Sequence, residues 1–253
     1  MRAMRRPVRK VLTGILALFL FPLAVHAVLY SAKDRPGSFF QADWSSTGML
    51  PAADADRDAR LLVFTGRTGR WKGIFVVHSW IVLKGENATN WPQPVRTNGW
   101  APDGRWFGDT PRVLVDVRGP EAAALIPKVK TAIAAYDFNQ PGDYWVWPGP
   151  NSNTFTATIL RAVPELKTTL PSNAVGKDFR RRPYAGPTDS GTGVEASLWG
   201  VLGVKLGWVE GVEFNFLGLV AGLDLRHPAL KLPGFGRLGI DDGTAIAAPA
   251  VAK

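Results

Sequence analysis

The sequence contains no cysteine, which leaves serine as the candidate nucleophile and the three histidines as candidate bases for it. His26 lies inside an N-terminal apolar segment, and His227 precedes Pro228 in a charged turn, as is typical of a surface residue. His78 lies in the middle of an apolar run, where an imidazole is costly to bury without a partner. It is therefore either a core histidine bonded to a neighbour or a general base that faces a nucleophile.

The segment PGPNSNTF, residues 148–155, places a serine at the expected start of a helix. In a structural interpretation, Asn151 or Ser152 caps the free amides of the first turn. In a catalytic interpretation, the Ser152 hydroxyl attacks a substrate, and His78 is the base that takes its proton. The helix N-terminus would then stabilise an oxyanion. The first-turn residues expected to position the substrate or hold this oxyanion are Asn151, Asn153 and Thr154.

These residues need a scaffold, and the sequence predicts strands around them. Residues 60–65 and 74–83 form a predicted hairpin. The second run is apolar on both alternating sets, which predicts a central strand. Residues 112–117 form a further strand, and from its place there Asp116 is assigned as a third catalytic member. In the loop 85–111, Trp91, Trp100 and Trp106 either anchor the loop or stack on a sugar.

Helices and further strands follow. Residues 119–136 predict a helix that Pro127 kinks or divides, and a second short helix runs from Ser152 to near Pro164. Val212, Phe214 and Phe216 alternate with Glu213 and Asn215, which predicts a half-buried antiparallel strand. Strands, helices and strands in this order predict an α+β fold, with an antiparallel sheet and a few packed helices.

The N-terminus predicts export or membrane anchoring. Five basic residues precede an uncharged stretch from Val11 to Tyr30, which is long enough to span a bilayer. Cleavage after Ala27 is the alternative. Residues 1–30 are thus a signal peptide or anchor, 31–58 a lead-in, 59–240 one globular domain and 241–253 a disordered tail. We expect a protein of the bacterial inner membrane, on its periplasmic side, or of the periplasm, with the membrane as a partner if the segment is retained.

The charge and the absent motifs exclude several functions. The net charge of +9 owes five units to the leader, which leaves 25 basic and 21 acidic residues, a net of +4. This balance argues against a nucleic-acid partner. Asp54, Asp56 and Asp58 imitate a calcium loop, but Ala59 and Thr65 replace its glycine and glutamate. Histidines are too few for a histidine-based zinc site, and no phosphate-binding glycine loop is present, so we expect no metal and no cofactor.

The leader, the HSW strand, WPGPNSNTF and the glycine-rich end together resemble a bacterial family of unknown function, known mainly as predicted membrane or exported proteins. A remoter resemblance links His78 and residues 151–155 to circularly permuted papain-like enzymes, the NlpC-type amidases and lecithin retinol acyltransferases. In those enzymes a strand histidine precedes an Asn-Cys-x-x-Phe segment that starts a helix. Here Ser152 occupies the cysteine position, so this resemblance implies either a serine enzyme or the fold without its chemistry.

Two hypotheses follow. The favoured one is a non-catalytic binding or structural protein of the cell envelope, in which His78 and Ser152 support the fold. The alternative is a serine-dependent amidase, esterase or acyltransferase that acts on an envelope substrate, either peptidoglycan or lipid. A distance beyond about 6 Å between His78 and Ser152, or a side chain packed between them, would exclude the catalytic pair; if the two face one another, labelling with a serine-directed fluorophosphonate is the next test.

Overall fold

In the computed structural model, which describes residues 2–89 and 101–239, the predicted hairpin is part of a three-stranded antiparallel sheet ordered β2-β1-β3. Its strands are β1 (Arg60–Arg67), β2 (Val77–Lys84) and β3 (Arg112–Arg118). The prediction of a central strand at residues 74–83 is wrong: β1 is central and β2 lies at the edge. The apolar residues of β2 are buried on one face of the strand by a helix and on the other by aromatic loop residues. A strand at the edge of a sheet can therefore be apolar on both faces.

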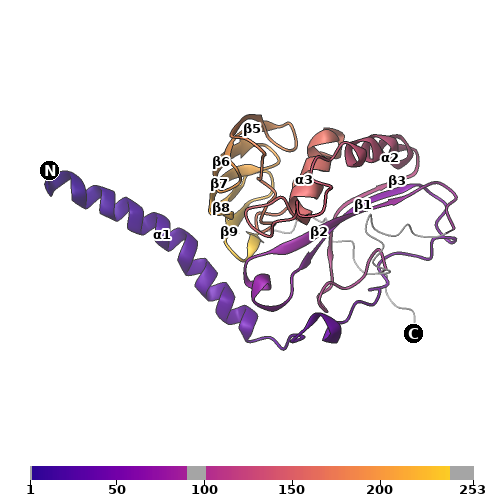
Figure 1. The fold of residues 1–253 in the computed structure, drawn as a ribbon, viewed down its shortest axis with the longest axis horizontal. Helices are drawn as coiled ribbons and strands as arrows, with labels where there is room; N and C mark the ends of the chain where they lie inside the picture. Colours follow the sequence, from indigo (N-terminus) through magenta and orange to yellow (C-terminus); the bar gives the residue numbers. More distant parts are fainter. Residues whose placement is uncertain (1, 90–100, 240–253) are drawn as a thin grey trace.

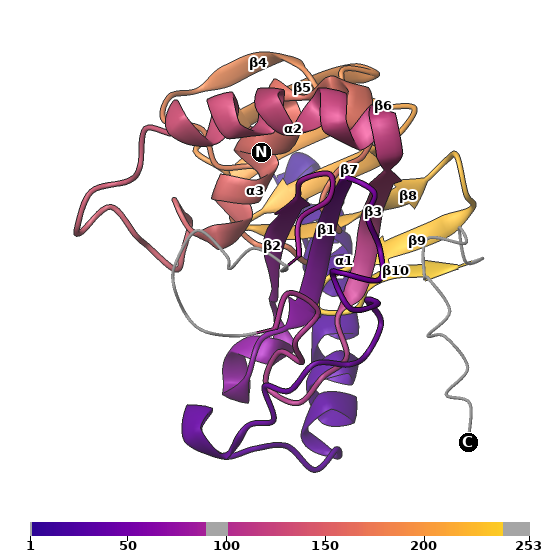
Figure 2. The same ribbon diagram turned by 90° about the vertical axis from the view of Figure 1, so that its right-hand side faces the viewer.

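Two helices cover one face of this sheet, as Figures 1 and 2 show. They are α2 (Gly119–Ala134) and α3 (Ser152–Ala162), and a 3-10 helix, η3 (Pro164–Leu166), follows. The predicted helices are confirmed, and Pro127 lies inside α2 without dividing it. The buried α2 side chains recur every three or four residues, so one stripe of the helix packs on the sheet. They are Ala122, Leu125, Ile126 and Val129.

Loop residues cover the opposite face. Met49 and Leu50 pack against a buried cluster that includes Phe64 of β1, so part of the predicted lead-in is packed on the sheet. The 3-10 helices η1 (Phe39–Gln41) and η2 (Arg70–Ile74) lie within this loop-rich region. Trp91, Trp100 and the predicted tail, residues 241–253, lie outside the described residues.

The C-terminal part of the chain forms a seven-stranded antiparallel sheet in the order β10-β9-β8-β7-β6-β5-β4. Its strands follow one another along the chain through short turns, and the sheet stands beside α3 (Figure 1). The strands are β4 (Tyr184–Pro187), β5 (Gly193–Leu198), β6 (Leu202–Gly207), β7 (Gly211–Phe216), β8 (Leu219–Asp224), β9 (Ala229–Leu232) and β10 (Gly236–Gly239). The α+β class with antiparallel sheets is therefore confirmed.

The polarity of this second sheet is reversed. A half-buried strand usually turns its apolar side chains to the interior, but Phe214 and Phe216 of β7 are 53% and 40% exposed. Glu213 and Asn215, between them, are 2% and 7% exposed. The alternation itself is present, as predicted, but the polar set points inward. The reason is that the inner face packs on a charged segment, residues 177–189, rather than on apolar side chains.

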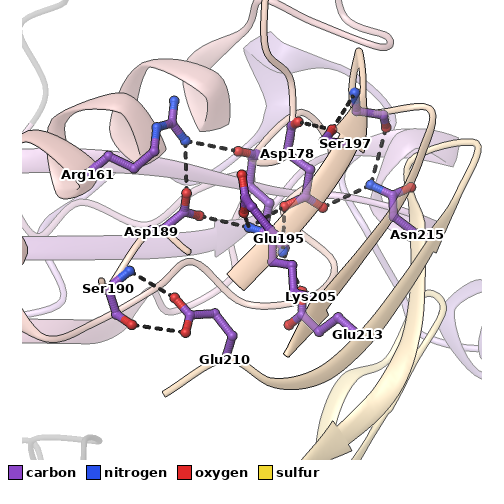
Figure 3. A network of polar contacts seen from close by, with 12 residues as sticks. Arg161, Asp178, Asp189, Ser190, Glu195, Ser197, Lys205, Glu210, Glu213 and Asn215 are labelled. Carbon is purple, nitrogen blue, oxygen red and sulfur yellow. Dashed lines mark hydrogen bonds and ion pairs between the residues drawn. The ribbon is translucent and has the colours of Figure 1, made fainter. Parts of the chain in front are cut away.

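Figure 3 shows this buried polar network, which we call the ionic core. Lys205 lies at its centre, with its Nζ 2.8 Å from Asp178 and from Glu195 and 3.1 Å from Asp189. Nine of its ten charged members form ion pairs with one another, which offsets the cost of burying those charges, and the Glu210 carboxylate accepts hydrogen bonds from the Ser190 amide and hydroxyl. The ten are Arg161, Lys177, Arg180, Lys205 and Lys231, and Asp178, Asp189, Glu195, Glu210 and Glu213.

The N-terminal segment is a single long helix, α1 (Arg2–Ser31), which extends away from the domain (Figure 1). Residues Thr13–Ser31 are long and apolar enough to cross a membrane. The C-terminal half of α1 packs on the domain, where the Tyr30 hydroxyl donates hydrogen bonds to the carbonyls of Thr68 and Arg70 at 3.1 and 2.9 Å. The predicted apolar N-terminal helix is thus present.

Candidate active site

The segment 148–155 forms a tight helix start. Asn151 has extended backbone and precedes the first residue of α3. Its side-chain oxygen accepts hydrogen bonds from the amides of Asn153 and Thr154 at 2.9 and 3.1 Å, and the Thr154 hydroxyl accepts one from the Asn151 amide at 3.1 Å. This reciprocal arrangement is a capping box, and it fixes the direction in which α3 begins.

The helix start is also tied to the edge of β2. The Asn153 side chain donates to the Val77 carbonyl at 2.7 Å and accepts a hydrogen bond from the Ser79 hydroxyl at 2.9 Å. The Val77 amide donates to the carbonyl of Asn173 at 3.1 Å. These bonds satisfy backbone groups that an edge strand leaves unpaired, and they hold the first turn of α3 against the strand that carries His78.

This docking brings His78 and Ser152 together. The His78 Nδ1 and the Ser152 Oγ lie 2.7 Å apart, although 74 residues separate them in the sequence. Both side chains are half-buried. We assign Nδ1 as the acceptor of a hydrogen bond from the Ser152 hydroxyl and Nε2 as the ring N–H, because a serine hydroxyl donates readily to a neutral imidazole.

Desolvation lowers the pKa of His78 to about 4. The imidazole is therefore neutral at pH 7 and able to accept a proton. The ring also stacks on Trp106, with centroids 4.0 Å apart and planes inclined by 14°. This stacking fixes the orientation of the ring while Nδ1 points at Ser152.

Trp106 belongs to the site, although the sequence predicts for it only a role as a loop anchor or as a residue that stacks on a sugar. It reaches His78 because Gly66, which pairs with His78 across the β1–β2 ladder, has no side chain. A Cβ on Gly66 would lie 2.7 Å from the Cβ of Trp106. A glycine inside a strand often marks such a close approach, and this was the available signal.

The predicted oxyanion residues have a different arrangement from the one expected. The amides of Asn153 and Thr154 already donate to Asn151, and the amide of Phe155 donates to the Asn151 carbonyl at 2.9 Å. Within the described part of the chain, the Ser152 amide has no protein acceptor. It is consequently the first-turn donor that an oxyanion can use, and Asn151 is a cap.

Asp116 does not reach the pair. It pairs with Leu62 on one side of β1, whereas His78 pairs with Gly66 on the other side. Its carboxylate binds Arg60 at 2.8 Å and Arg118 at 2.8 Å. The assignment of Asp116 as a third member is corrected accordingly: the strand order places it beyond β1, in an ion-pair cluster. None of the described carboxylates hydrogen-bonds His78.

The other histidines lie elsewhere. His227 is in the turn between β8 and β9, where its amide donates to Asp224 at 3.0 Å. His26 is on α1, with its ring 4.8 Å from that of Phe235. No group of three or more histidine, aspartate or glutamate side chains is placed to hold a metal ion among the residues that the structure describes.

Comparison with known proteins adds a family match. Residues 58–179 match a family described as "Protein of unknown function (DUF3750)". The matched region begins just before β1 and ends just after the segment that contacts Asn151, so it contains both His78 and Ser152. No curated protein and no solved structure matches the chain.

Proposed function

We propose that this protein is a serine-dependent hydrolase or acyltransferase that acts on an ester or amide. The observation that carries the proposal is the 2.7 Å contact between His78 Nδ1 and Ser152 Oγ at the N-terminus of α3. A nucleophile and its base must lie within hydrogen-bond distance, and these two do. The order of a strand histidine and then a nucleophile that starts a helix supports a permuted papain-like arrangement in which serine replaces cysteine.

The reaction follows from this arrangement. The Ser152 Oγ attacks the carbonyl carbon of the substrate and forms a C–O bond, while its proton passes to His78 Nδ1. The carbonyl oxygen becomes negative and accepts a hydrogen bond from the Ser152 amide at the positive end of the helix. When the bond to the leaving group breaks, His78 returns the proton to that group. Water or a second acceptor then attacks the acyl-serine in the same way.

The electrostatics of His78 favour serine over a thiolate mechanism. A papain-like cysteine ionises and forms a pair with a protonated histidine, which needs a histidine of raised pKa. Here the desolvated environment lowers the pKa of His78 to about 4, so the ring stays neutral at pH 7. A neutral imidazole is the form that a serine nucleophile requires, because the hydroxyl transfers its proton only during attack.

The location of the site supports an envelope substrate. We propose that α1 anchors the chain in the bacterial inner membrane with the domain on the periplasmic side, since its basic flank favours the cytoplasm. An exposed apolar loop, residues 144–147, leads directly into the capping turn of Ser152. Trp147 of this loop donates to the Leu217 carbonyl at 2.9 Å. These apolar neighbours favour a lipid-like substrate over peptidoglycan.

Labelling with a fluorophosphonate probe tests the proposal. The full-length protein in detergent is expected to be labelled, and Ser152→Ala and His78→Gln are expected to lose the label. Ser45→Ala, which removes an exposed serine, is the matched control and should be labelled as well as the native protein. Equal labelling of the native protein and Ser152→Ala would remove Ser152 as the nucleophile.

A non-catalytic envelope protein is the second candidate. It is favoured by the use of the Asn153 and Thr154 amides in the cap and by the lack of a carboxylate on His78 among the described residues. In that case Ser152 and His78 join β2 to α3 and nothing more. A folded native protein that takes no label, combined with a lower melting temperature of His78→Gln, would support this second candidate.

A further inference from the structure

The outer face of the seven-stranded sheet is apolar from edge to edge. The strands are in register, so that Leu202 pairs with Phe216, Val204 with Phe214 and Leu206 with Val212. These side chains share the outward face with the alternate residues of the neighbouring strands. The outward set is Ala185, Pro187, Val194, Ala196, Leu198, Leu202, Val204, Leu206, Val212, Phe214, Phe216, Leu219, Ala221, Leu223, Leu230, Leu232 and Leu238. We call this surface the apolar face.

Most side chains of the apolar face are exposed, and Ala221, near the contact with α1, is buried. Val194, Leu206 and Phe214 are 63%, 57% and 53% exposed. The inward positions of the same strands hold mainly glycine and polar or charged side chains, among them Glu195, Lys205 and Glu213 of the ionic core (Figure 3). A sheet with one face in water presents polar side chains there and buries its apolar side chains. Apolar side chains outward and polar ones inward are instead the pattern of sheets that meet lipid.

The helix α1 packs on this same surface. It contacts β8 and β9, and the ring of Phe19 meets that of Phe216 edge to face, with centroids 5.9 Å apart. Phe19 is 5% exposed, while Leu20 and Phe21 beside it are 55% and 70% exposed. One stripe of the helix is therefore covered by the domain, and the remaining surface is apolar and continues into the apolar face.

The position of this contact along α1 sets its depth. Phe19 lies nine residues after Lys10, the last basic residue before the apolar span, which is about 14 Å along the helix axis. The hydrocarbon layer is about 30 Å thick. If α1 spans the membrane from Lys10, Phe19 lies near its middle, and Phe216 is at the same level.

Tryptophans border the apolar face. Trp199 lies in the turn between β5 and β6, and Trp208 lies in the turn at the opposite end of β6. They are 48% and 61% exposed. Tryptophan is enriched where a membrane protein passes from hydrocarbon to the polar headgroups. The two tryptophans at the ends of the strands therefore fit an apolar face that lies in hydrocarbon and ends where the polar headgroups begin.

We infer that the apolar face of the seven-stranded sheet is immersed in the lipid bilayer, beside α1. A soluble partner does not fit, because such a partner would have to cover a surface that continues into a membrane-spanning helix. The inference rests on the proposed anchoring by α1 and is independent of the proposed catalysis. It explains the reversed polarity of the sheet, because the outer face meets lipid and the inner face meets the ionic core.

Spin labels can test this directly, because the chain has no native cysteine. Val204→Cys and Phe214→Cys probe the apolar face, Leu20→Cys probes the exposed side of α1, and Lys130→Cys on α2 is the water-exposed control. Each full-length variant is labelled and reconstituted in vesicles of phosphatidylethanolamine and phosphatidylglycerol. Collision with oxygen and with a water-soluble nickel chelate is then measured for each label.

We expect labels at 204 and 214 to match the label at 20, with high access to oxygen and low access to nickel, and the label at 130 to show the reverse. A nickel-accessible label at 204 and 214 with a lipid-exposed label at 20 would overturn the inference and leave the anchoring intact. A nickel-accessible label at 20 would overturn the anchoring itself. Spin–spin broadening at 214 would replace lipid by a second copy of the chain. None of these outcomes depends on fluorophosphonate labelling.

Discussion

The His78 Nδ1 lies 2.7 Å from the Ser152 Oγ because the first turn of α3 is fastened to the edge of β2. Asn153 makes the fastening bonds to the strand, and Asn151 turns the chain into the helix. The two reacting groups thus belong to rigid elements rather than to loops. This relationship makes specific predictions for pH dependence and for the residues that hold the pair together.

The rate of fluorophosphonate labelling is expected to follow the protonation of His78. Since desolvation lowers the pKa of His78 to about 4, the ring loses its proton on raising the pH through about 4. The rate should rise across that range and stay flat from about pH 6 upward. A stopped-flow or gel-based pH series measures it, with circular dichroism to confirm folding at each pH. A midpoint near 6.5, the ordinary value, would contradict the assignment.

Asn153→Ala is expected to weaken both the fold and the site. It removes the donor to Val77 and the acceptor for Ser79, leaving buried polar groups unpaired. The free energy of unfolding should fall by about 2 kcal/mol or more. Labelling of Ser152 should fall at least about tenfold at temperatures where the variant is folded. Asn139→Ala, at an exposed loop position, should leave both quantities unchanged, and equal behaviour of the two variants would count against a positioning role.

Lys205→Met is expected to disrupt the ionic core. It leaves Asp178, Asp189 and Glu195 without the cation that lies between them. Removal of one partner from a buried ionic group destabilises a protein by about 3–5 kcal/mol. Chemical unfolding in detergent measures this loss. The control is Lys128→Met, which removes an exposed lysine paired with Glu165 and should not change stability measurably. A stable Lys205→Met variant would show that the network does not need its central charge.

The ionic core also predicts how stability depends on pH. Burial alone would raise the pKa of Asp178, but Lys177 and Lys205 lower it below its ordinary value. Burial alone would also raise the pKa of Glu213, but Lys177 and Lys231 lower it below its ordinary value. Since these folded values lie below the unfolded values of about 4, the carboxylates stabilise the protein above about pH 4, and this contribution is lost as the pH falls further.

The basic members act in the opposite direction. Burial alone would lower the pKa of Lys205, but Asp178, Asp189 and Glu195 raise it well above its ordinary value. Its contribution is present below about pH 10.4 and is lost as the pH rises through the raised folded value. A series of melting temperatures should therefore fall at both extremes. Lys205→Met should show a flatter profile at both ends, and an unchanged acid limb would contradict the pairing.

The sequence by itself determined the local features of this protein. Helix starts and ends depend on neighbouring residues, so the capping turn at Asn151 and the extent of α2 were predictable. The apolar leader and the alternation of strand β7 were equally plain. His78 and Ser152 were also identifiable as candidates, because few residues of this chain can act as a base or as a nucleophile beside a helix start.

Only the tertiary structure decided which groups meet and which way each face points. Asp116 was separated from His78 because β1, not β2, is the central strand. The amides of Asn153 and Thr154 were taken by the cap. Period-two alternation cannot say which set of β7 side chains faces inward, because it specifies only that the two sets differ. The ionic core made that choice, and it is assembled from charges that lie far apart in the sequence.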